Sequence, residues 1–443
     1  SSGLDLIRPH QIAEPDVLFP AWDRPDLNLA CLELLVGMVY LAAPPRDEED
    51  WLARKPEVDQ LKAGLESLSS AFDLLGDGPR FMQDLEQLDT DANRPDMLFI
   101  DSAGGQASKL NKDLIVKRNR YDTLPLNIAA MALYTLQNFA PAGGAGNRTS
   151  MRGGGPMVTL VRPARSNLWS LIWANVPQGA PLTKEELTEL PWMRPTKTSK
   201  NHEETAPPDS SVLAPETFFG QPRRLRLVAN GGRITGVQQV PHGTNYSSWV
   251  HPLSPYYYSK TEKLPKHPKP GPFGYRSWRG VLLSAEGADR PQCLVRFLHQ
   301  RTGERASLLV GGWAMSNMNP LDFVWSEPPV FSFHEDSEAW ACRLVEASEC
   351  AANSLVSSVR IGKGENSNQS GAAYRARESL FQQTQGSFEN QVLRLASVIE
   401  LEEAMRSTIS KDWLAVLRTT ALAILDSEIL PGLADLQEKR RKP

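Results

Sequence analysis

The glycine-rich stretch at residues 139–159 contains the residue types with the most specific chemistry in this chain. It reads F-A-P-A-G-G-A-G-N-R-T-S-M-R-G-G-G-P-M-V-T, with Arg148 and Arg152 between two glycine clusters. Glycine reaches positive φ and lets a partner approach the main chain without a side chain in the way. Arginine adds a planar, permanently charged donor for phosphate groups or base edges. The stretch therefore predicts a loop that contacts a flat, polar and negatively charged partner.

The loop matches neither of two common phosphate-binding motifs, the P-loop and the G-x-G-x-x-G fingerprint. A P-loop requires G-x-x-x-x-G-K-[ST], whereas residues 143–150 read G-G-A-G-N-R-T-S and lack the lysine. The G-x-G-x-x-G fingerprint fails because Thr149 stands where its third glycine belongs. Nucleotide hydrolysis at this loop is therefore excluded.

Residues for other kinds of catalysis do not form a recognisable pattern. The seven histidines show no H-x-x-x-H or H-x-H spacing, the four cysteines no C-x-x-C pair, and no G-x-S-x-G elbow occurs. His251, in W-V-H-P-L-S-P, is interpreted as a structural histidine in a proline-fixed turn. We predict a protein that is not an enzyme and that needs no metal and no other cofactor.

Charge is distributed unevenly along the chain, although the net charge is only −4. Residues 1–104 hold 8 Lys and Arg against 21 Asp and Glu, residues 105–332 hold 27 against 15, and residues 333–443 hold 13 against 16. A basic middle between acidic flanks is typical of a protein with one face on a polyanion. Chance clustering of solvated charge explains the same numbers equally well.

The elements that must position these residues are visible as periodic segments. Helices are expected at 27–41, 57–75 and 127–139, strands at 97–100 and 157–161, a helix or strand at 168–176, and hairpins at 225–237 and 293–310. The first hairpin turns at Asn230-Gly231, the preferred pair for a tight primed turn. The helix at 127–139 leads directly into the glycine loop.

The fold class that these elements predict is α+β. A mixed α/β main domain with β-hairpins is expected at 1–332, followed by a C-terminal all-α, four-helix-type bundle at 333–443 with a Gly/Ser/Asn-rich break at 362–371. The most apolar segment, 27–43, contains Glu33, which argues against a membrane span. The cysteine pattern favours a reducing compartment, the cytoplasm.

A polar excursion at 102–124 carries five basic residues: Lys109, Lys112, Lys117, Arg118 and Arg120. Flexible basic segments of this kind become ordered on a phosphate backbone. On composition alone a solvated loop is preferred, and both interpretations stay open at this point.

Several motifs resemble the CasA family, the large subunit of the type I-E CRISPR Cascade. The matching stretches are N-R-T-S-M-R-G-G-G-P at 147–156, L-A-C-L-E-L-L-V-G at 29–37, R-F-M-Q at 80–83, L-F-I-D at 98–101, W-V-H-P-L-S-P at 249–255 and G-G-W-A-M-S-N-M-N-P at 311–320. Because they keep their order over most of the chain, the resemblance is specific.

The resemblance implies a subunit of an RNA-guided surveillance complex. Such a subunit contacts the 5′ handle of the guide RNA and adjoins the backbone, handle-binding and small subunits. It recognises the short PAM in double-stranded target DNA, mostly from the minor groove, and promotes duplex opening and R-loop formation. It then helps to recruit the helicase-nuclease effector. The target itself is read by RNA–DNA pairing, so the protein needs only a few base contacts.

The resemblance also implies which residues bind. PAM and DNA contacts map to the glycine loop (Ala142, Gly143, Gly144, Ala145, Gly146, Asn147), the flanking Arg148 and Arg152, and a hairpin wedge (Ser316, Asn317, Met318). Ala145 replaces a frequent glycine of the family, and Asn317 stands where some relatives have glutamine. Val240 stands where a lysine contact is common, so Gln239, His242, Thr244 and Asn245 are substitutes.

Docking on the guide handle and on neighbouring subunits maps to the 102–124 excursion, with Phe99, Ile100 and Asp101 at its root. Two alternatives to this function remain: a purely architectural subunit that closes the complex at the handle, and an enzyme with an unrecognised site.

Overall fold

The computed structural model describes residues 3–53, 55–102, 118–144, 146–210, 212–334, 336–363 and 371–440. It divides into two compact units. The first comprises residues 1–272 and 291–328, and the second comprises residues 273–290 and 329–443. The segment 273–290, which the sequence analysis assigned to the main domain, therefore groups with the C-terminal helices.

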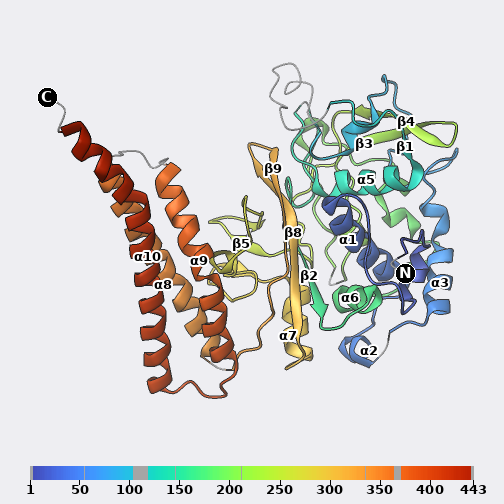
Figure 1. Ribbon diagram of the computed structural model, residues 1–443. Coiled ribbons are helices and arrows are strands. Elements are labelled where there is room, and N and C mark those ends of the chain that lie inside the picture. Colours follow the sequence, from blue (N-terminus) through green and yellow to red (C-terminus); the bar gives the residue numbers. More distant parts are fainter. Residues whose placement is uncertain are drawn as a thin grey trace. The chain divides into compact units, whose positions relative to one another are not determined.

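Three helices form the centre of the first unit (Figure 1): α1 (Pro25–Ala42), α5 (Leu126–Phe139) and α6 (Leu168–Asn175). Helix α1 begins with proline at its first position, where a missing N–H costs nothing. Among the described residues, it alone is long and apolar enough to cross a membrane, yet 72% of its apolar window is buried inside the protein. That burial is what a core helix requires, because an all-round apolar surface must be covered.

Two antiparallel sheets complete the frame. One has the order β2-β8-β9, built from Val158–Pro163, Ala306–Ser316 and Asn319–Ser326. The other has the order β1-β4-β3, built from Leu124–Pro125, Arg233–Val240 and Arg224–Asn230. Strands β5 (Tyr256–Tyr258) and β6 (Lys263–Pro265) form a further antiparallel pair.

Shorter helices fill the periphery of the first unit. They are α2 (Glu48–Ala53), α3 (Val58–Ser67), α7 (Gln292–Gln300) and the 3₁₀ turns Pro9–Ala13, Ser69–Ala71, Pro95–Leu98, Leu187–Glu189, Pro191–Met193, Lys200–His202 and Pro215–Thr217. Helix α2 is fixed by a reciprocal pair of hydrogen bonds. The Trp51 indole N–H donates to the Trp173 carbonyl at 3.0 Å, and the Trp173 indole N–H donates to the Trp51 carbonyl at 2.9 Å.

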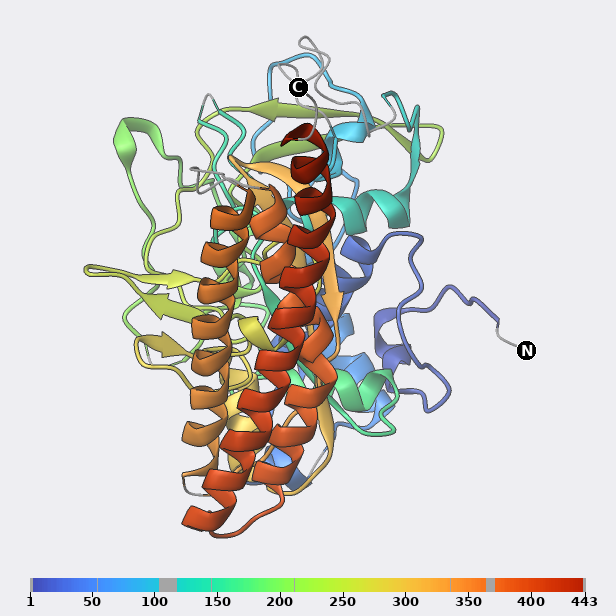
Figure 2. The same cartoon turned by 60° about the vertical axis from the view of Figure 1, so that its left-hand side comes forward.

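In the described part of the second unit, three long helices lie side by side (Figure 2): α8 (Ser337–Lys363), α9 (Gly371–Ala396) and α10 (Glu403–Arg440). The unit also contains the 3₁₀ turn Tyr275–Ser277 and the short strand β7 (Ala288–Asp289). Tyr275 stacks on Phe388 with ring centroids 4.1 Å apart, and the indole N–H of Trp413 donates to the Leu344 carbonyl. Large buried aromatic rings therefore hold the helices together.

The α+β fold class and the C-terminal helical segment are confirmed, as are the helices at 27–41 and 127–139 and the hairpin at 225–237. The helix expected at 57–75 is shorter, ending at Ser67. Most of the expected break at 362–371 lies outside the described residues.

Two sequence predictions are wrong. Residues 97–100 are not a strand, because Pro95 begins a 3₁₀ turn there. Residues 293–299 are not one arm of a hairpin but belong to helix α7, whose apolar residues Cys293, Leu294 and Phe297 share one buried face. A short apolar run does not distinguish these two states by periodicity alone. Strand β8 pairs instead with β2 and with β9.

Candidate nucleic-acid interface

The tip of the glycine loop presents bare main chain to solvent. Helix α5 ends at Phe139, and the Gly143 N–H then donates to the Asn147 carbonyl at 3.1 Å while the Asn147 N–H donates to the Gly144 carbonyl at 2.8 Å. Ala142, Gly143 and Gly144 are exposed, and Gly144 has φ +66° with no atom within 4 Å of the place of a Cβ. Ala145 lies outside the described residues. The hydrogen bonds thus make a compact turn whose outer side is open.

The end of β4 and the loop after it support this turn. The His242 N–H donates to the Gly146 carbonyl at 3.0 Å, and the Gln239 side chain donates to the Asn147 Oδ1 at 2.5 Å. The expected substitutes Gln239 and His242 therefore do lie beside the loop. Thr244 is not accessible to DNA, since it is only 3% exposed and lines a small pocket. Asn245 donates to Glu204 at 3.4 Å.

The second glycine cluster packs against the hairpin of β8 and β9. A Cβ on Gly154 would lie 2.9 Å from the Met318 Sδ, and one on Gly155 would lie 2.3 Å from the Trp313 carbonyl oxygen. These two glycines therefore serve close packing, a purpose that sequence reasoning did not assign to them. The contact places the glycine loop directly beside the hairpin tip.

That hairpin tip contains the three residues of the expected wedge. Asn317 and Met318 both have positive φ (+47° and +62°), as a two-residue primed turn requires. Ser316, Asn317 and Met318 are exposed, Met318 by 44%. An exposed asparagine and an exposed apolar side chain thus stand on a tight turn next to the glycine loop.

Arg148 and Arg152 do not have the same surroundings. Arg148 is half-buried, and its Nε donates to the Ser199 Oγ at 2.8 Å. Arg152 is only 2% exposed; its Nη2 lies 2.5 Å from the Glu33 Oε1, and its Nη1 donates to the Ser254 Oγ at 3.1 Å. In this structure the Arg152 guanidinium is therefore paired with a buried carboxylate and is not exposed for the DNA contact that was predicted.

Two buried titratable groups beside Arg152 have shifted pKa values. Burial raises the pKa of Glu33, while Arg152 opposes that rise. His251, only 1% exposed, lies with its Nε2 3.9 Å from the Glu33 Oε1. Burial, together with the charge of Arg152, holds the pKa of His251 well below its ordinary value, so the ring is neutral. The structural role expected for His251 agrees with this, as its Nδ1 accepts from the Leu253 N–H.

Arg223 is a residue of the interface that sequence reasoning missed. It is 7% exposed, and its guanidinium donates to two loop carbonyls, of Arg148 at 2.7 Å and of Pro141 at 2.5 Å. Burial lowers the pKa of this arginine to about 10. The available signal was the run of basic residues at 223–226, at the start of strand β3, where the structure buries Arg223, Arg224 and Arg226.

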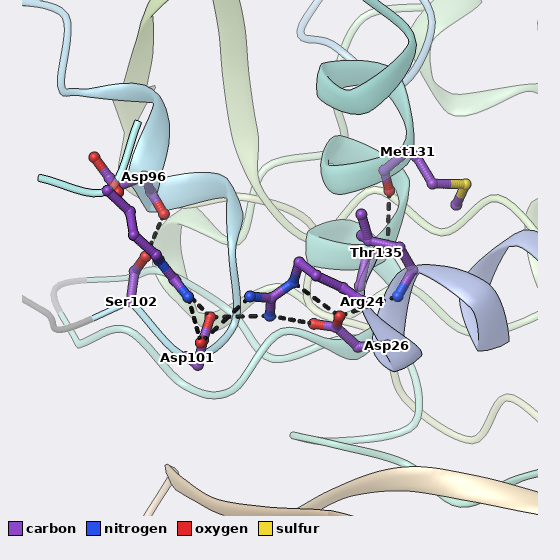
Figure 3. A network of polar contacts seen from close by, with 9 residues as sticks. Arg24, Asp26, Asp96, Asp101, Ser102, Met131 and Thr135 are labelled. Carbon is purple, nitrogen blue, oxygen red and sulfur yellow. Dashed lines mark hydrogen bonds and ion pairs between the residues drawn. The ribbon is translucent and has the colours of Figure 1, made fainter. Parts of the chain in front are cut away.

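The base of the basic excursion is closed by a charged network (Figure 3). Asp101 accepts two hydrogen bonds from Arg120, both at 2.9 Å, and two from Arg24, at 3.0 and 3.4 Å. Arg24 also pairs with Asp26, on the first turn of α1. Burial alone would raise the pKa of Asp101, but the two arginines outweigh it and hold that pKa below its ordinary value.

Aromatic packing strengthens the same base. Phe99 and Ile100, expected at the root of the docking loop, are buried, and Phe99 stacks on Tyr121 with ring centroids 4.7 Å apart. Arg118 lies at the edge of the described segment. The remaining expected docking residues, Lys109, Lys112 and Lys117, lie outside the described residues. The structure thus shows how the excursion is rooted at Asp101 and Arg120.

Side chains that could bind a metal ion are dispersed. Within the described ranges, no group of three or more His, Cys, Asp or Glu side chains is arranged to hold a metal ion.

Comparison with known proteins decides the family. The model of the CRISPR-associated protein Cse1 family matches residues 2–424, nearly the whole chain. The chain belongs to the Cse1 family. The expected family, the CasA-type large subunit of type I-E Cascade, is thereby confirmed. No curated protein sequence matches this Cse1 chain significantly.

Solved structures of Cse1 proteins share the fold. A CasA from Thermus thermophilus has a TM-score of 0.69 at 16% identity, over 96% of this chain and 95% of that one. Thermobifida fusca Cse1 has a TM-score of 0.66 at 18% identity, over 92% and 91%. A structure titled "CRISPR RNA-guided surveillance complex, pre-nicking" has a TM-score of 0.56 at 14% identity, over 92% and 90%. Identities this low establish similarity of fold, whereas the family model establishes membership.

Proposed function

We propose that this Cse1 chain recognises the PAM of double-stranded target DNA with its glycine loop and hairpin tip, and that it thereby starts duplex opening and R-loop formation. The observation that carries the proposal is the packing of Gly154 and Gly155 on the β8–β9 hairpin, because it holds two different probes side by side. One is an exposed backbone turn, and the other is an exposed turn with projecting side chains.

The glycine turn suits the minor groove. That groove is about 6 Å wide, so main chain without side chains enters it more easily than a branched surface does. Gly143 and Gly144 are exposed, and the Gly144 turn is fixed by hydrogen bonds rather than free to collapse. Arg148, half-buried on Ser199, is the arginine of the loop that remains available for a neighbouring phosphate.

The hairpin tip suits a wedge. Inserting a side chain between base pairs costs a few kcal/mol of stacking, which contacts to the bent or opened DNA must offset. Asn317 and Met318 supply a polar and an apolar side chain on a tight turn in which both residues have positive φ. The adjoining glycine loop supplies the contacts that offset the cost.

Partners and location follow as further parts of the proposal. The excursion rooted at Asp101 and Arg120 docks on the 5′ handle of the guide RNA and on neighbouring Cascade subunits. The opened target is then passed to the helicase-nuclease effector. The chain itself performs no catalysis and works in the cytoplasm.

The proposal is tested by measuring target binding across a PAM library, using the other Cascade subunits with guide RNA, with and without this chain. We expect tight binding to a subset of flanking sequences only when the chain is present. Equal binding to all flanks in its presence would instead establish a purely architectural subunit. Nuclease or ATPase activity of the purified chain would establish an enzyme and refute the proposal.

The wedge is tested by the double variant Asn317→Ala, Met318→Ala. R-loop formation on duplex target should weaken, while binding to a target already unpaired next to the PAM should be spared. An equal loss on both substrates would show that the tip does not act as a wedge.

A further inference from the structure

The ion pair between Glu33 and Arg152 is buried almost completely. Glu33 is 0% and Arg152 2% exposed, and their closest atoms are 2.5 Å apart. Arg152 belongs to the glycine loop, whereas Glu33 lies in the middle of the core helix α1, 119 positions away in the chain. The pair therefore ties the loop to the most deeply buried helix of the first unit.

Stability alone does not explain such a pair. Removing two charges from water costs about as much as their attraction returns, so an apolar pair of similar volume is often equally stabilising. The His251 Nε2 beside the pair also has no hydrogen-bond partner among the described residues, which adds to the cost. What an ion pair adds beyond an apolar contact is a fixed direction and length, because guanidinium and carboxylate meet in defined geometry.

That geometry is transmitted to the candidate interface over a short distance. The carbonyl of Arg152 accepts from the His267 Nε2 at 3.1 Å, and the Gly155 N–H donates to the Phe139 carbonyl at 3.1 Å. Residue 154 between them touches Met318 of the hairpin tip. The guanidinium also lies over the Phe139 ring, 5.9 Å from its centroid, where the loop begins. Fixing Arg152 thus fixes both stems of the loop and its contact with the hairpin.

We infer that Glu33 is a positioning residue for PAM discrimination, although it lies in the core and touches no DNA. Through Arg152 it fixes the position of the glycine loop relative to the hairpin tip, so that both enter the DNA together. The inference rests on the proposed function and adds to it a residue that sets sequence discrimination rather than affinity.

The experiment separates positioning from stability by replacing the ion pair with an apolar pair. The variant Glu33→Leu, Arg152→Met is assembled with the other Cascade subunits and guide RNA. Three quantities are measured: the melting temperature of the chain, the affinity for a target already unpaired next to the PAM, and the ratio of affinities for PAM and non-PAM duplexes. The matched control is Glu327→Leu, Arg162→Met, which removes a partly exposed Arg–Glu pair at 2.9 Å between strand β2 and the residue after β9.

We expect the core variant to melt near the wild type and to bind the unpaired target within about twofold, while its PAM ratio falls about tenfold or more. The control should keep all three values. If the core variant keeps the wild-type PAM ratio, the ion pair merely stabilises the fold and the inference is overturned. If it does not fold, Glu33→Gln is measured in the same assay. Glutamine keeps the shape but removes the negative charge that holds the Arg152 guanidinium, so the PAM ratio should again fall, and an unchanged ratio overturns the inference. Absence of any PAM preference in the wild-type complex would refute the proposed function itself, an outcome distinct from the others.

Discussion

Two glycines of the loop allow backbone strain to be separated from lack of space. Gly144 and Gly155 have nearly the same φ, +66° and +65°, but a Cβ would meet nothing at Gly144 and the Trp313 carbonyl oxygen at 2.3 Å at Gly155. Replacement by alanine therefore strains the backbone at both positions, but only at Gly155 does the added methyl group lack space.

The magnitudes follow from these two terms. An L-residue in the left-handed region costs about 1–2 kcal/mol, which applies to both variants. Overpacking against a backbone atom adds about 1–3 kcal/mol for Gly155→Ala only, because backbone cannot rotate away as a side chain does. At roughly 2 °C per kcal/mol for a unit of this size, Gly155→Ala should melt about 2–6 °C below Gly144→Ala.

DNA binding should respond to Gly144→Ala although that variant adds no crowding inside the protein. A methyl group at Gly144 stands on the exposed tip, so we expect about a tenfold weaker PAM-dependent affinity from a nearly intact fold. Gly303→Ala is the matched control, since Gly303 has φ +82°, no atom near its Cβ position and a place in the turn before β8. It should melt like Gly144→Ala and bind DNA like the wild type.

Thermal melts and duplex binding of the three variants decide the matter. Equal melting temperatures of Gly144→Ala and Gly155→Ala would refute the packing argument. Weakened DNA binding by Gly303→Ala would show that strain anywhere in the unit, rather than access at the tip, explains the loss.

Three further predictions concern charges and the hairpin turn. Arg148→Gln should lower the slope of log affinity against log salt concentration for DNA binding by about one. Arg152→Met should leave that slope unchanged and cost about 3–5 kcal/mol of stability, because it leaves the buried Glu33 carboxylate without its partner. A lower slope for Arg152→Met would restore Arg152 as a phosphate contact. Asp101→Asn should be less stable than the wild type at pH 7, and the gap should close as the pH falls below 3.8, because a carboxyl whose pKa is depressed on folding loses its contribution on protonation; a constant gap in acid denaturation would contradict this. Met318→Gly should weaken duplex opening, because it removes the apolar side chain of the tip while glycine keeps φ +62° without strain; unchanged duplex opening would contradict this.

Elements with a strong local pattern could be predicted from the sequence. The helix at residues 126–139 and the hairpin around Asn230-Gly231 follow from side-chain periodicity and turn chemistry, which involve only neighbours in the chain. The family could also be predicted, because ordered motifs identify it without knowledge of any contact. Helix α7 and the 3₁₀ turn at Pro95 were mistaken for strands because each is too short for its period to show.

The two segments that form the candidate site could be predicted from the sequence, but the contacts of their individual residues could not. The glycine loop and the hairpin tip at Asn317 and Met318 were expected on the resemblance to CasA, and the structure places the two side by side. The resemblance gave no warning that Phe99 and Ile100 are buried, nor that Arg223 donates to the loop carbonyls. These facts depend on which surfaces meet, and periodicity does not encode that.

Composition and spacing by themselves determined that residues 139–159 contain a glycine-rich loop with arginines, lacking the lysine of a phosphate cradle. Only the tertiary structure decided what each residue does there. Gly144 stays open to solvent, whereas the hairpin occupies the space where a side chain of residue 155 would lie. Arg152 points inward and pairs with Glu33. The physical reason is that conformational freedom and charge are properties of a residue, whereas the partner of a buried charge comes from a helix 119 positions away.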